Sequence, residues 1–113
     1  MDSEINFSVI IPAYNPGKKI IPCLNALGKN LDYFCKNFKV KYEVLIINDA
    51  GDKINFNFDH GVKNIRSFRI RKNRGVGYIR QLGTRISKYN YILYLDSDIV
   101  LENENSIKIL FEE

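Results

Sequence analysis

Two aspartates that directly follow an apolar run are the residues of this chain best suited to chemistry. Residues 91–95 have the length and composition of a buried strand, and Asp96 and Asp98 come next with one residue between them. If the chain stayed extended past Leu95, both carboxylates would face the same way, because side chains alternate along a strand. Burying such a pair is costly unless a cation offsets its charge. The pattern therefore indicates Mg²⁺ or Mn²⁺, usually accompanied by a phosphate. A polar turn is the alternative.

Polar residues also follow two other apolar runs. Tyr14 comes after residues 7–11, and its aromatic face could stack on a base or a sugar. Asp49 comes after residues 42–47, and its carboxylate could accept hydrogen bonds from an imide N–H or a ribose hydroxyl. Each has a structural alternative, which is a tyrosine covering the sheet edge and an aspartate forming a turn.

A segment with two glycines, residues 73–77, precedes an expected helix. Gly75 would let the backbone approach a ligand closely, and the N–H groups at a helix start favour phosphate. The segment lacks the third glycine of a dinucleotide fingerprint and no Walker pattern occurs, so neither cofactor site is expected. Arg80, one turn into the helix, could reach a phosphate or pair with a carboxylate of the metal site. A solvated arginine is the alternative.

Charge is unevenly distributed along the chain. The net charge is +4 over 113 residues, yet no acidic residue lies between Asp59 and Asp96, and residues 66–88 hold eight Lys and Arg. Such a segment favours a polyanion, a membrane surface or a diphosphate as its partner, with a solvated face as the alternative. Nucleic acid is the least expected partner, because few aromatic residues are interleaved with these charges.

The composition is that of one soluble globular domain or part of one, with 45% hydrophobic and 27% charged residues. The acidic start and the lack of a long apolar run predict neither a secretory signal nor a membrane anchor within this stretch. Cys23 and Cys35 lie in one expected helix, about 18 Å apart along its axis, so they cannot form a disulfide there. We interpret both as inert packing residues in a reducing, cytoplasmic location.

Strands and helices alternate along the chain and must position these residues. Strands are expected at residues 7–11, 42–47, 64–70 and 91–95, and helices at 18–36, 75–88 and 106–112. Gly28 weakens the first helix and could break it. Apolar runs of this kind are typical of strands buried on both faces of a mostly parallel sheet, so the expected fold class is α/β, Rossmann-like, with helices on both faces. Ligands of such sheets bind beyond the carboxyl ends of the strands. An unpaired sheet edge would invite self-association.

Four segments, in this order, resemble those of the family 2 glycosyltransferases with the GT-A fold. They are Ser8-Val9-Ile10-Ile11-Pro12-Ala13-Tyr14-Asn15, Glu43-Val44-Leu45-Ile46-Ile47-Asn48-Asp49, Asn73-x-Gly75 with Ile79-Arg80-Gln81-Leu82-Gly83, and the stretch from Tyr91 to Asp98. The last is similar to the family's Asp-x-Asp metal motif. The resemblance covers essentially the whole chain.

The resemblance implies transfer of a sugar, with inversion, from a UDP- or GDP-sugar to a glycan or lipid-linked acceptor, as in polysaccharide biosynthesis. By position, Tyr14 and Asp49 would hold the base, and Pro12 and Ala13 would lie under the nucleoside.

The resemblance also implies roles on the diphosphate side of the donor. Gly75 and Arg80 would belong to the nucleotide site, with Arg80 near the phosphates or the metal-binding acids. Asp96 would lie by the ribose or the metal, and Asp98 would be the most direct ligand of the Mn²⁺ or Mg²⁺ that bridges the diphosphate. The metal would offset the charge that builds on the departing diphosphate.

Some positions depart from the family pattern. Asn48 stands where the family usually has the first acid of Asp-Asp-Gly-Ser, Gln81 stands where Asn is commoner, and Ile99 stands where a third acid often follows. In the family, the acceptor-binding half and the general base lie further along, so here they are expected beyond Glu113. We therefore interpret residues 1–113 as a single domain, the donor-binding half of a truncated glycosyltransferase, and expect it to be inactive alone.

Two other functions stay open at this point. One is a non-catalytic module that binds a nucleotide or phosphate. The other is a related nucleotidyltransferase, although residues 13–18 match its Gly-rich loop poorly. For a longer parent protein, the cytoplasmic face of a membrane is an alternative location.

Overall fold

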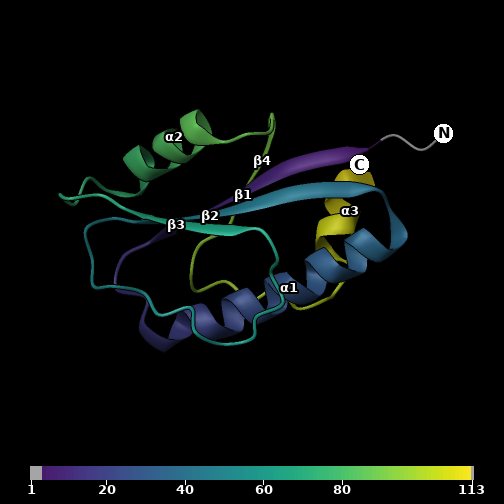
Figure 1. Cartoon of the computed structure of the whole chain (residues 1–113), viewed down its shortest axis with the longest axis horizontal. Coiled ribbons are helices and arrows are strands. Elements are labelled where there is room, and N and C mark those ends of the chain that lie inside the picture. Colours follow the sequence, from purple (N-terminus) through teal and green to yellow (C-terminus); the bar gives the residue numbers. More distant parts are fainter. Residues whose placement is uncertain (1–3, 113) are drawn as a thin grey trace.

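The computed structural model describes residues 4–112 as four strands and three α-helices (Figure 1). The elements are β1 (Ile5–Ala13), the short 3-10 helix η1 (Gly17–Lys19), α1 (Ile20–Asn37), β2 (Val40–Asn48), β3 (Ile65–Arg69), α2 (Val76–Ile86), β4 (Tyr91–Tyr94) and α3 (Ser106–Glu112). Every strand and α-helix expected from the sequence is present, and its bounds differ by two residues or fewer. None of the described helices has the length and apolar composition needed to cross a membrane.

The four strands form one parallel sheet in the order β3-β2-β1-β4. Ala13 pairs with Asn48, so the two central strands end side by side. The apolar runs of β1 and β2 are buried, as expected. The expectation of burial on both faces is wrong for the two edge strands. Strand β3 is exposed at four of its five positions, and β4 is exposed at both ends and only partly buried between them. The parallel α/β architecture itself is confirmed.

Helices cover both faces of the sheet, with α1 and α3 on one side and α2 on the other (Figure 1). The larger core lies on the α1 side and includes Phe7, Val9 and Ile11. The smaller core lies under α2, where Ile10 and Ile79 pack together. Neighbouring residues of β1 thus enter opposite cores, which is why its sequence is apolar throughout.

Helix α1 runs unbroken through Gly28, and a structural contact explains why glycine stands there. A Cβ at this position would lie 1.9 Å from the carbonyl oxygen of His60. The loop between β2 and β3 therefore packs directly on the helix backbone. The break that Gly28 suggested does not occur, because this tertiary contact requires both the helix and the missing side chain.

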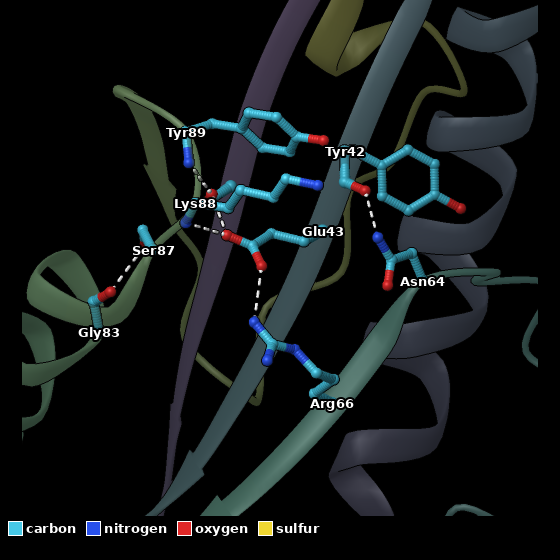
Figure 2. A network of polar contacts seen from close by, with 9 residues as sticks. Tyr42, Glu43, Asn64, Arg66, Gly83, Ser87, Lys88 and Tyr89 are labelled. Atoms are coloured by element: carbon cyan, nitrogen blue, oxygen red, sulfur yellow. Dashed lines mark hydrogen bonds and ion pairs between the residues drawn. The ribbon is translucent and has the colours of Figure 1, made fainter.

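One buried carboxylate ties three strands to the loop between α2 and β4 (Figure 2). The Oε2 atom of Glu43 accepts hydrogen bonds from Ser8 Oγ and the Lys88 N–H, both at 2.6 Å. Its Oε1 atom accepts one from Arg66 Nη2 at 3.0 Å. Burial by itself would raise the pKa of Glu43, but these hydrogen bonds and the charge of Arg66 together hold that pKa below its ordinary value.

Candidate functional site

One cavity of about 460 Å³ lies where the chain leaves β1, β2 and β4. Six of the predicted site residues line it: Pro12, Ala13, Tyr14, Asp49, Asp96 and Asp98. The expectation that the strand ends converge on one pocket is therefore confirmed. The side chain of Tyr14 is 57% exposed, so its ring is free to stack on a ligand.

Asp96 and Asp98 reach the cavity from a tight turn. Strand β4 ends at Tyr94, and the Ile99 N–H donates to the Asp96 carbonyl at 3.0 Å. The chain is thus not extended past Leu95, and that premise of the sequence reasoning is wrong. The turn still leaves both exposed carboxyl groups on the cavity wall.

Arg80 pairs with the first of these aspartates. Its Nη2 atom lies 3.2 Å from Asp96 Oδ1, and its guanidinium lies 5.7 Å from the centroid of the Tyr94 ring. The hydroxyl of Thr84 donates to the Arg80 carbonyl at 2.8 Å and contacts the Tyr94 hydroxyl. An exposed ion pair of this kind contributes little stability. The ion pair matters for the position of the groups, because it holds the Arg80 guanidinium against the carboxylate of Asp96, as the sequence suggested.

Asp49 uses both carboxylate oxygens within the protein. Oδ1 accepts from the Arg74 N–H at 2.7 Å, and Oδ2 accepts from the Gly75 N–H at 2.8 Å. The side chain of Asn73 donates to the Asp49 carbonyl at 3.3 Å. Asp49 is only 6% exposed, and Gly75 does not line the cavity. Two of the amides expected to face a phosphate therefore face Asp49 instead.

The departure at Asn48 has a structural reason. Its Nδ2 donates to the Asp52 carbonyl at 2.8 Å, and its Oδ1 accepts from the Gly51 N–H at 2.9 Å. Asn15 Oδ1 accepts from the Asp52 N–H at 2.6 Å, which joins this loop to the end of β1. An aspartate at position 48 could accept but could not donate, so the observed loop requires the amide.

The structure adds cavity residues that the sequence reasoning missed. Lys19, the last residue of η1, lines the same cavity as the carboxylates. Val76 and Ile79 form part of the wall from α2. Lys19 lies in the loop and short helix that follow β1, as Tyr14 does. That position after a strand end could have identified it as a candidate site residue.

The donor set suits a hard divalent ion that also binds phosphate. Within residues 4–112 no group of three or more His, Cys, Asp or Glu side chains is placed to hold an ion. Asp96 and Asp98 alone would leave most coordination positions to water and ligand oxygens. This is the usual arrangement of Mg²⁺ in phosphate sites, so the residues present fit the predicted Mg²⁺ or Mn²⁺.

The two cysteines differ in their surroundings. Cys23 is buried beneath the turn, and its Sγ donates to the Asp96 carbonyl at 3.7 Å. Burial, and then the charges of Asp98 and Asp96, raise the pKa of Cys23 to about 11. The thiol is therefore protonated near neutral pH. Cys35 is exposed, so its interpretation as a packing residue is wrong.

Comparisons with known proteins point to one family. Residues 8–113 match the profile of Glycosyl transferase family 2. Dolichyl-phosphate beta-glucosyltransferase ALG5C of Trichomonas vaginalis is 30% identical over 103 residues, covering 85% of this chain and 30% of that protein. Poly(ribitol-phosphate) beta-N-acetylglucosaminyltransferase TarP of Staphylococcus aureus is 32% identical over 117 residues, covering 92% of this chain and 31% of that protein.

The fold is also similar to a solved structure. The crystal structure of S. aureus TarS 1-349 superposes with a TM-score of 0.77 at 26% identity, covering 96% of this chain and 32% of that one. The chain thus spans about a third of the length of the relatives that it matches. Since the family profile extends over nearly all its residues, this protein belongs to glycosyl transferase family 2.

Proposed function

We propose that this chain is the donor-binding half of an inverting glycosyltransferase, and that it holds a nucleoside diphosphate sugar together with a divalent cation. The observation that carries the proposal is the single cavity shared by Tyr14, Asp96 and Asp98. An exposed aromatic ring at one strand end and two carboxylates at another suit the two ends of such a donor. Membership of the family supports this function.

In this proposal the nucleoside lies over the ends of β1 and β2. Tyr14 stacks on the base, Pro12 and Ala13 support the nucleoside from below, and Asp49 stands at the same end of the cavity. The UDP- or GDP- identity of the donor stays a prediction.

The diphosphate lies toward Asp96 and Asp98, which would hold the cation. A bound Mg²⁺ or Mn²⁺ supplies Lewis-acid stabilisation of the leaving diphosphate. Arg80 fixes the orientation of Asp96 through their ion pair. Lys19 adds a positive charge on the cavity wall, where it suits the phosphates.

We also propose a class of acceptor. The names of the relatives above include dolichyl phosphate and poly(ribitol phosphate), which supports a glycan or lipid-linked acceptor that carries phosphate. We assign no general base within residues 4–112. A cytoplasmic location and self-association through a sheet edge stay predictions.

Calorimetric titration tests the proposal. We expect UDP, GDP or their sugars to bind in the presence of Mn²⁺ and to bind more weakly without it. Asp98→Asn should reduce metal-dependent affinity about tenfold or more, the effect expected from losing a charged interaction. The matched control is Glu104→Gln, which neutralises an exposed carboxylate outside the cavity and should leave binding unchanged.

The result that would overturn the proposal is a folded, Mn²⁺-loaded sample that binds none of these nucleotides. Sugar transfer separates a glycosyltransferase half from a module that only binds. Sugar transfer should be measured with a longer polypeptide that also contains the part of the sequence that the relatives have beyond the region matched here. Nucleotide binding without any sugar transfer would favour the non-catalytic module.

A further inference from the structure

The carboxylate of Asp49 joins the end of β2 to the start of α2. Its two oxygens accept hydrogen bonds from consecutive backbone amides, those of Arg74 and Gly75, at 2.7 and 2.8 Å. The residue is buried, with 6% of its surface exposed. This two-point contact spans 25 and 26 positions of sequence and fixes the distance between the two elements.

The start of α2 needs such a partner. The first amides of a helix have no acceptor within the helix, and its amino end carries a partial positive charge. The residue that precedes α2 is Gly75, which has no side chain to cap these amides. Its φ of +89° places it in a backbone region that favours glycine. The anion at this amino end comes from another element: Asp49 meets it through the amide of Gly75, the N-cap residue, and the amide of Arg74 just before it.

The same helix supplies several parts of the cavity. Val76, the first residue of α2, lines the cavity together with Ile79. Arg80 does not line the cavity itself, but it pairs with Asp96, which does. A shift at the amino end of α2 would move all three residues.

We propose that Asp49 is a positioning residue, which closes the amino end of α2 and so sets Val76, Ile79 and Arg80 in the nucleotide site. This inference deepens the proposed function and rests on it for its effect on binding. Asp49 performs this role through the backbone of Arg74 and Gly75, in addition to any contact that it makes with the nucleotide from the cavity wall.

Amide hydrogen exchange tests the contact without any nucleotide. In the wild-type chain, the amides of Arg74 and Gly75 should exchange about tenfold or more slowly than the Lys72 amide, for which no hydrogen bond is found within residues 4–112. Asp49→Asn replaces one accepting oxygen with a donor and should release at least one of the two amides. Exchange of both wild-type amides at the rate of Lys72 would overturn the proposal, even if the variant does not fold.

Binding separates positioning from direct base contact. With Mn²⁺ present and well below the melting temperature, Asp49→Asn should weaken the binding of inorganic pyrophosphate as well as that of UDP, because Arg80 and Asp96 serve the phosphates in the proposed site. The control Asp52→Asn changes an exposed neighbour whose backbone, not its side chain, makes the loop's hydrogen bonds, and it should change neither affinity.

Loss of UDP and uridine binding with pyrophosphate affinity kept would overturn the positioning role in favour of base contact. Unchanged affinity for both probes in the variant would also overturn it. If the wild-type chain binds neither probe, the proposed function fails, and the exchange measurement still decides whether Asp49 holds the helix start.

Discussion

Removal of the Glu43 carboxylate should destabilise this fold more than removal of any exposed acid. The side chain is 3% exposed and accepts three hydrogen bonds from Ser8, Arg66 and the Lys88 amide. In Glu43→Ala the buried Ser8 hydroxyl and the Lys88 N–H would lose this acceptor, and Arg66 would lose its counter-ion. Breaking a buried charged network costs about 3–5 kcal/mol. Because the guanidinium of Arg66 is itself half exposed, we expect the lower end of that range.

Urea unfolding followed by circular dichroism measures this effect, and the chain has no tryptophan to complicate tyrosine fluorescence as a second probe. Asp32→Ala is the matched control, because it removes an exposed carboxylate from an i,i+4 pair with Lys36 and should cost less than about 0.5 kcal/mol. Equal unfolding free energies for the two variants would refute the reasoning.

The same carboxylate predicts how stability depends on pH. Its pKa is lower in the folded chain than in the unfolded chain, so protonation favours the unfolded state. Its contribution is fully present above the ordinary glutamate pKa, about 4.3, and is lost as the pH falls through the lower folded pKa. The acid-induced loss of stability should therefore be shallower in Glu43→Ala than in the wild-type chain, and parallel curves would contradict this.

Further substitutions test the site and its loops. Gly75→Ala should lower the unfolding free energy by about 1–3 kcal/mol, because φ is +89° there. The control Gly77→Ala, within α2, should be neutral or should stabilise the fold by up to about 1 kcal/mol. In calorimetry, Lys19→Gln should weaken UDP binding about tenfold and leave uridine binding unchanged. The control Lys18→Gln changes a neighbouring residue outside this cavity and should affect the binding of neither ligand. Asn48→Asp should lower the melting temperature, since the loop loses its amide donor, and an unchanged melting temperature would refute the account of this departure.

Much of the fold could be predicted because its signals are local. The continuous apolar runs of β1 and β2 specify buried central strands, and the 3.6-residue spacing of apolar side chains specifies α1 and α2. The strand ends also indicated the cavity, because parallel strands place their carboxyl ends at one edge of the sheet. The exposure of β3 could not be read in the same way, because strand order is decided by pairing between distant segments.

The residue types and their places after the apolar runs were sufficient to place Tyr14, Asp49, Asp96 and Asp98 around one cavity, because a parallel topology brings the carboxyl ends of neighbouring strands together. The partners of those residues depended on the tertiary structure. The turn that holds Asp98 is local and matches the polar turn that the sequence left open, whereas the backbone amides that Asp49 binds lie 25 and 26 positions away, and no local pattern encodes those hydrogen bonds. Side-chain chemistry is a local property of sequence, whereas the partner of each polar group is settled only when distant elements pack together.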